Sequence, residues 1–121
     1  MIANTNFGMP LGRMNLILRV VSAEFGVSLP DLLSHRRMRT IARPRQIACW
    51  LAQHATTYSM PQIGDRLGNR DHTTILHAIR QIEELRAQDL ALRERTDTLL
   101  DRVLAICIGT AQLEPIGALT A

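Results

Sequence analysis

A chain of 121 residues is long enough for one domain with a modest hydrophobic core. Aromatic residues make up only 3% of it, so Leu, Ile, Val, Ala and Met must build the core, which favours packed helices over a sheet sandwich. The net charge is +3, and the fourteen lysine-or-arginine positions are all arginine. The longest apolar stretch, near Leu99–Ile108, is short and contains Asp101 and Arg102, which excludes a membrane span there.

Hydrophobic spacing and capping residues predict an all-α bundle of about six helices. Met1–Pro10 and Gly109–Ala121 show no clear pattern and are predicted to be flexible, which leaves residues 11–108 as the folded domain. A loop, Ser34–Ala42, precedes a helix that Pro44 is predicted to start. In chain order, the predicted helices are Leu11–Phe25, Pro30–Leu33, Pro44–Thr56, Pro61–Leu67, 71–88 and Leu90–Ile108.

The fourth and fifth predicted helices form a helix-turn-helix. Ser59 and Gln62 make nearly a full capping box at the start of the fourth helix, and Gly68 ends it. The fifth helix starts at Asp71 and carries an apolar stripe of Ile75, Ile79 and Ile82. DNA-binding proteins use two helices joined by such a turn to place the second helix in the major groove.

The segment Arg70–Thr74 opens that second helix with charged and small polar side chains. A helix N-terminus carries a partial positive charge and free N–H groups, and in helix-turn-helix proteins its first residues reach base edges. Asp71 has an equally good structural interpretation, because aspartate is a common N-cap. The segment upstream shifts the balance towards nucleic acid.

Positive charge is concentrated in the middle of the chain. Five arginines fall between residues 36 and 45, and from Leu32 to Arg80 eight arginines face two aspartates, a net charge of +6. From Gln81 to the end the net charge is −3. Arginines this dense repel one another unless an anion is near, and guanidinium groups suit phosphates and a narrow minor groove. A solvated run of charge is the alternative interpretation.

Patterns for catalysis are missing from the sequence. It contains no GxxxxGK[ST] phosphate loop, no GxSxG and no HExxH, so we expect no enzyme activity, no bound nucleotide and no cofactor. His72 and His77 are five residues apart, which does not place them on one helix face for a metal ion. Cys49 and Cys107 form no CxxC pair and are predicted to be buried free thiols. With no signal-peptide pattern, these thiols indicate a cytoplasmic protein, and DNA binding there would make it nucleoid-associated.

A family resemblance lies in four segments: Asp31–Arg37, Ala42–Gln46, Ser59–Gly64 and Gly68–Ala78. Their order and spacing resemble the C-terminal DNA-binding domain, domain IV, of the bacterial replication initiator DnaA. The resemblance covers about 16–103 and implies a TrpR-like helix-turn-helix fold. It also implies binding of double-stranded DNA at the DnaA box, a short asymmetric site, and regulation of replication initiation or transcription by site occupancy.

The resemblance implies which side chains touch DNA. The implied base contacts are Arg37 in the minor groove, Asp71, His72 and Thr73 in the major groove, and Met60 and Pro61 near thymine methyl groups. The implied phosphate contacts are Arg39, Arg45, Gln46, Arg70, Thr74 and His77. Base chemistry agrees, because aspartate accepts from the cytosine amino group and threonine or histidine can contact thymine.

The chain departs from the family pattern in places. His35, Gln53 and Gln81 stand where the family often has lysine, so weaker non-specific affinity is expected. Asn69 replaces a frequent glycine and tolerates a left-handed backbone. The family's ATPase module and N-terminal interaction domain are missing from this sequence. Occupancy of a site, without ATP-driven assembly, is therefore the expected mode of action.

Other classes of function stay open at this point. The chain could be a protein-interaction module that recruits a partner through the C-terminal stripe of Leu99, Leu100, Val103 and Leu104. It could also be an accessory subunit that targets an enzyme to DNA. A fragment of a longer initiator is a third alternative, although Met1 and the unpatterned start favour a natural short protein.

Overall fold

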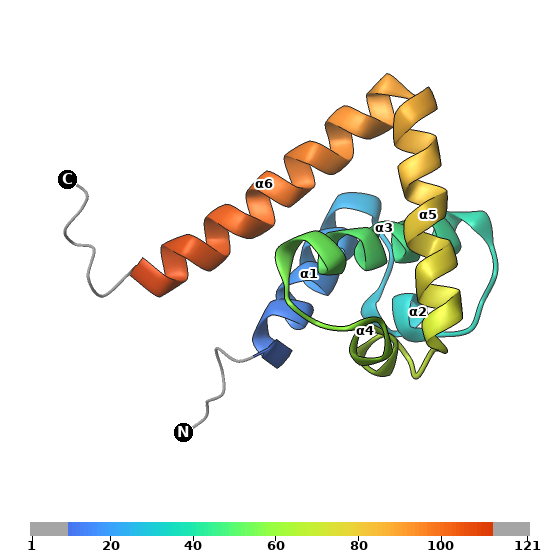
Figure 1. Ribbon diagram of the computed structural model, residues 1–121, viewed down its shortest axis with the longest axis horizontal. Coiled ribbons are helices and arrows are strands. Elements are labelled where there is room, and N and C mark those ends of the chain that lie inside the picture. The colour runs from blue at the N-terminus through green and yellow to red at the C-terminus, as the bar shows by residue number, and fades with distance from the viewer. Residues whose placement is uncertain (1–9, 113–121) are drawn as a thin grey trace.

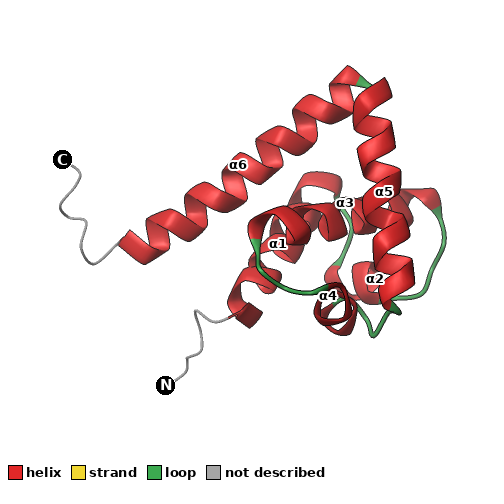
Figure 2. Ribbon diagram, in the orientation of Figure 1, coloured by secondary structure: helices red, strands yellow, loops and turns green. Residues whose placement is uncertain are grey.

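The computed structural model describes residues 10–112, which form six helices and no strand (Figure 1, Figure 2). The helices are α1 (Pro10–Phe25), α2 (Leu29–Leu33), α3 (Arg39–Ala55), α4 (Met60–Arg66), α5 (His72–Gln88) and α6 (Leu90–Gln112). The predicted all-α fold is confirmed. Of the two segments predicted to be flexible, residues 1–9 and 113–121 lie outside the described residues, whereas Pro10 and residues 109–112 belong to helices.

Helix α3 is the centre of the fold and packs against each of the other five helices. Ile47, Trp50 and Leu51 on this helix are almost completely buried. Burial of apolar side chains is the main stabilising term in folding, so α3 holds the bundle together. The indole N–H of Trp50 donates to Glu83 Oε2 on α5 at 2.7 Å, which satisfies the one polar atom of this core side chain.

The start of α3 differs from the prediction that Pro44 begins it. The helix begins at Arg39, and Pro44 is its sixth residue. The backbone N–H groups of Ile41 and Ala42 both donate to Met38 O, at 2.9 and 2.7 Å, which completes a first turn before the proline. Pro44 then removes only the hydrogen bond to the carbonyl of Thr40, which is an exposed residue. The loop is therefore residues 34–38, and it is shorter than Ser34–Ala42.

Helix α6 covers the core from the side of α1, α3 and α5. Leu99 and Val103 are buried, and Leu100 and Leu104 are partly buried against the same core. This contradicts the expectation that these four side chains form a stripe open to a protein partner. The apolar surface of α1, α3 and α5 needs a cover to exclude water, and the stripe of α6 is that cover.

A side-chain cluster joins α6 to α3 and α5. The Arg86 guanidinium on α5 stacks over the Trp50 ring at 4.5 Å. The same group donates to Thr96 Oγ1 at 2.6 Å and to Asp97 Oδ1 at 2.7 Å, both on α6. A charge-assisted hydrogen bond to the hydroxyl of Thr96, which is fully buried, fixes how α6 lies against the bundle.

The helix-turn-helix is formed by α4, residues 67–71 and α5. Ser59 Oγ accepts from Gln62 N at 3.3 Å and Gln62 Oε1 accepts from Ser59 N at 2.9 Å, so the capping box is complete. In the turn, Gly68 and Asn69 have φ of 85° and 58°. Glycine adopts this left-handed region without strain and asparagine tolerates it, which confirms the role expected for Asn69.

Candidate nucleic-acid interface

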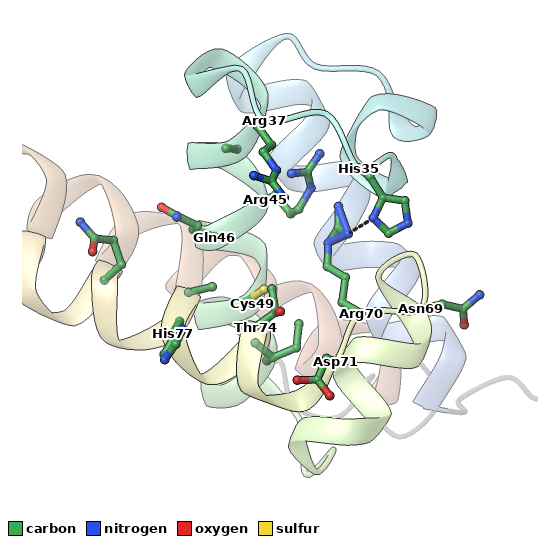
Figure 3. Close-up of a pocket in the computed structure, with 14 residues that line it drawn as sticks. His35, Arg37, Arg45, Gln46, Cys49, Asn69, Arg70, Asp71, Thr74 and His77 are labelled. Atoms are coloured by element: carbon green, nitrogen blue, oxygen red, sulfur yellow. Dashed lines mark hydrogen bonds between the residues drawn. The ribbon is translucent and has the colours of Figure 1, made fainter.

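A groove of about 490 Å³ lies between the loop 34–38 and the first turns of α3 on one side and the N-terminal half of α5 on the other (Figure 3). Seven of the twelve side chains predicted to contact DNA line this groove: Arg37, Arg45, Gln46, Arg70, Asp71, Thr74 and His77. Residues separated by up to forty positions in the sequence are therefore brought to one surface. Its walls carry several positive charges and few negative ones.

The other five predicted side chains lie outside the groove, all at the start of a helix. Arg39 begins α3, Met60 and Pro61 begin α4, and His72 and Thr73 begin α5. All are exposed except Met60, which is half-buried against the core. The structure thus divides the predicted set into groove residues and helix-start residues, and it leaves four of the five helix-start side chains open to solvent.

Close backbone contacts hold the turn of the helix-turn-helix. Arg70 N donates to Gly64 O at 2.8 Å, and a Cβ on Gly64 would collide with the carbonyl oxygen of Arg70. A Cβ on Gly68 would collide with the carbonyl oxygen of Leu33, at the end of α2. Only glycine fits at these two positions without a shift of the backbone. The turn is therefore seated against α4 on one side and α2 on the other.

Asp71 caps α5 and also presents its carboxylate to solvent. Asp71 Oδ2 accepts from Thr73 N at 3.1 Å, which is the N-cap bond. Its other oxygen, Oδ1, lies 3.7 Å from His72 Nδ1, and the Asp71 side chain is 65% exposed. The cap uses one side of the carboxylate, so a donor from outside could still reach the other.

Arg45 is held within the protein by backbone carbonyls. Its Nε donates to Leu32 O at 2.8 Å, Nη1 donates to Arg36 O at 2.8 Å and Nη2 donates to Asp31 O at 3.0 Å. Burial and the nearby positive charge of Arg70 lower the pKa of Arg45. The guanidinium thus joins α3 to the end of α2 and to the loop.

Arg70 binds the same loop from the other side of the groove. Its Nη2 donates to Ser34 O, and its Nη1 lies 3.4 Å from His35 Nδ1. Figure 3 marks the contact between Arg70 and His35 with a dashed line. Burial lowers the pKa of Arg70 as well. Two arginines, one from α3 and one from the turn before α5, therefore hold the segment that carries Arg37.

Three polar groove residues were not among the predicted contacts: His35, Asn69 and Gln81. In the sequence, His35 and Gln81 stand out only as positions where the family often has lysine, and the spacing of Gln81, four residues after His77 on α5, is a further signal for it. The floor includes Cys49, whose burial raises the pKa of its thiol to about 12, so the group is neutral. Cys107 is half-buried, which corrects the expectation that both thiols are buried.

The family of the chain follows from comparison with known sequences. A family model described as the bacterial dnaA protein helix-turn-helix matches residues 14–82, more than half of the chain. The chain belongs to this family. The matched segment runs from α1 to Ile82 on α5 and so contains the residues that line the groove and the helix-turn-helix up to that residue.

Relatives of the chain are chromosomal replication initiator proteins named DnaA. The protein from Caulobacter vibrioides is 54% identical over 83 residues, and the one from Brucella abortus is 49% identical over 87 residues. These alignments cover 69% and 72% of this chain but 17% and 18% of the relatives. The chain therefore spans less than a fifth of the length of these relatives.

A solved structure described as a DNA replication initiation factor has the same fold, with a TM-score of 0.75. The match covers 81% of this chain and 30% of the solved one, at 24% sequence identity.

Among the described residues, no helix is long and apolar enough to cross a membrane. The described residues also contain no group of three or more His, Cys, Asp or Glu side chains that could hold a metal ion.

Proposed function

We propose that this protein binds double-stranded DNA at sites like the DnaA box and acts by occupying them, in the regulation of replication initiation or of transcription. The observation that carries the proposal is the groove with arginine on both walls. Arg37 and Arg45 line one wall and Arg70 lines the other. Membership of the bacterial DnaA helix-turn-helix family supports the same ligand.

Electrostatics favour an anion in this groove. Arg70 is close enough to Arg45 for its positive charge to lower the pKa of Arg45. Asp31 and Asp71 are the acids nearby, and the Asp71 carboxylate already caps α5. Like charges held at one surface repel, so a phosphate between the walls would lower the electrostatic energy of the protein.

The shape of the groove favours a duplex over a free phosphate. The start of α5 is the element that enters the major groove in helix-turn-helix proteins. A neighbouring loop with an exposed arginine suits the adjacent minor groove, which attracts guanidinium groups where it is narrow. One sugar-phosphate backbone separates the major groove from the adjacent minor groove of DNA. The protein groove between the loop and α5 offers a place for this backbone. Base contacts then come from Arg37 and the start of α5.

The proposal extends to single side chains. Base contacts are assigned to Arg37, Met60, Pro61, Asp71, His72 and Thr73. Phosphate contacts are assigned to Arg39, Gln46, Arg70, Thr74 and His77, and Arg45 is treated separately below. Hydroxyl, amide, imidazole and guanidinium groups are all donors that phosphate oxygens accept.

A titration with matched duplexes tests the binding. The parent should bind a duplex that contains the box more tightly than a scrambled duplex, by on the order of a thousandfold or more. Arg37→Ala should lose most of this preference. Arg19→Ala is the control, because it removes one positive charge from an exposed position on α1 outside the groove. If Arg37→Ala and Arg19→Ala lost the preference for the box equally, only the total positive charge of the protein would matter, and the assigned contact of Arg37 would be wrong.

Occupancy is tested by competition. The sequence contains no lysine and no phosphate loop, so no ATP-driven change is expected on the bound site. Footprints of a duplex with one box, made with a full initiator and rising amounts of this protein, should show mutual exclusion. Simultaneous occupancy of one box, or a footprint that requires ATP, would contradict the proposal.

A further inference from the structure

We propose that Arg45 is a positioning residue that holds the loop 34–38 so that Arg37 is presented to the minor groove. This inference rests on the proposed function, because it concerns how the DNA-binding face is built. Arg45 would then act on DNA through Arg37, although its guanidinium lines the same groove and a direct phosphate contact is the simpler assignment.

The first support is where the three Arg45 bonds end. Asp31 O and Leu32 O belong to the last turn of α2, and Arg36 O belongs to the loop. The carbonyl of Arg36 is part of the peptide unit that leads into Arg37. Because a peptide unit is planar and rigid, a hydrogen bond to this oxygen fixes the plane from which the Arg37 backbone leaves.

The second support is that Arg37 lies between two fixed points. Before it, Ser34 Oγ donates to Asp31 O at 2.7 Å and accepts from Arg36 N at 3.3 Å, while Arg70 binds Ser34 O. After it, Met38 O accepts the first two hydrogen bonds of α3. The Arg37 side chain itself is exposed. This arrangement suits insertion of the guanidinium into a narrow DNA minor groove. Because the backbone of Arg37 is already fixed, less conformational entropy is lost on binding.

The third support is how the donors of Arg45 are used. A guanidinium has five N–H donors in a fixed fork, and three atoms of Arg45 are already engaged by carbonyl oxygens within 3.0 Å. The two N–H groups that remain are on Nη1 and Nη2, and turning the Nε edge of the group towards a phosphate would break the carbonyl bonds and release the loop. The structure therefore favours Arg45 as a part of the framework over Arg45 as a phosphate ligand.

A double-mutant cycle separates the two roles. Affinity for a box-containing duplex is measured for the parent, Arg37→Ala, Arg45→Ala and the double variant, each across a range of salt concentrations. If Arg45 acts through Arg37, Arg45→Ala should weaken binding on the order of tenfold in the parent and about twofold or less in the Arg37→Ala background. The salt dependence of the double variant should equal that of Arg37→Ala.

A direct phosphate contact gives the opposite result. The two losses would multiply, and the slope of log affinity against log salt would become shallower by about 0.9 on removal of Arg45 in either background. Arg39→Ala is the matched control, since Arg39 is an exposed arginine on the same helix and its side chain makes no hydrogen bond to a carbonyl among the described residues. Its loss should multiply with that of Arg37→Ala and reduce the slope by about 0.9.

Arg45→Lys covers the case in which Arg45→Ala does not fold. Lysine keeps the charge, but its single ammonium cannot span three carbonyls as a planar fork does. The positioning role predicts that Arg45→Lys loses most of the affinity for the box, whereas a phosphate role predicts that it keeps most of it. If Arg37→Ala binds the box as the parent does, the minor-groove part of the proposed function fails together with this inference. If Arg37→Ala is impaired but the losses multiply, only this inference fails.

Discussion

Asp71 allows helix capping and DNA reading to be measured separately. Its carboxylate accepts from Thr73 N at 3.1 Å and is 65% exposed. Alanine removes both the cap and the group that would reach a base. Serine is as good an N-cap as aspartate but is one bond shorter and uncharged, so Asp71→Ser keeps the cap and loses the contact.

The two variants should therefore differ in stability and agree in binding. Loss of an N-cap costs about 1 kcal/mol, so Asp71→Ala should melt roughly 4–8 °C below the parent, and Asp71→Ser close to it. Loss of a base contact costs about 1–3 kcal/mol, so both variants should bind the box roughly 5- to 150-fold more weakly. On scrambled DNA both should bind at least as well as the parent, because a negative charge near phosphate has been removed.

Thermal unfolding followed by circular dichroism gives the stability, and fluorescence anisotropy with box and scrambled duplexes gives the affinities. The decisive comparison is Asp71→Ser on the box. Full affinity of this variant would show that Asp71 only caps α5, and the assignment of a base contact would be wrong. Equal melting temperatures of all three proteins would instead show that the cap bond contributes nothing measurable.

Other predictions follow from the same geometry. If Arg39 and Arg70 each neutralise one phosphate, log affinity should fall against log salt with a slope of about −1.8, roughly a 12-fold loss between about 50 and about 200 mM salt; a flat titration would refute the electrostatic part. Arg37→Lys should restore little of the affinity lost in Arg37→Ala on A·T-rich sites, because lysine lacks the flat multi-donor head; equal binding of Arg37→Lys and the parent would indicate simple charge attraction. Gly68→Ala should lower the free energy of unfolding by more than Gly26→Ala, measured in urea, since both residues have positive φ but only the Cβ at Gly68 meets a backbone oxygen. A cost of about 1 kcal/mol for both would mean that the turn can move away from α2.

Local signals predicted the helix-turn-helix well. Ser59, Gly68 and Asp71 are residues whose own side chain, or lack of one, sets the backbone around them, and the structure confirms all three roles. The stripe of Ile75, Ile79 and Ile82 is buried as its spacing indicated. Capping residues and the spacing of apolar residues both act within one helix. Residues close together in the sequence are therefore enough to predict them.

Non-local contacts were the part that the sequence did not reveal. Pro44 is a typical helix-start residue, yet the first hydrogen bonds of α3 already end on Met38, and the proline removes only one further backbone bond, at the exposed residue Thr40. The bonds from Arg45 to Asp31 and Leu32 join residues more than a dozen positions apart. Arginine is generally exposed and solvated, so nothing in its neighbours marks one that is held by carbonyls.

The course of α6 has a practical consequence for measurement. This helix leaves the body on the side away from α2 and α4 (Figure 1), and Cys107 lies near its end, half-buried and free. The sequence has one other cysteine, Cys49, which is buried beneath the groove with its thiol pKa raised to about 12. Since the thiolate is the reactive form, a maleimide dye at neutral pH should attach to Cys107 alone. The native protein can thus carry a fluorescent reporter remote from the arginine-lined groove, with no substitution in the chain.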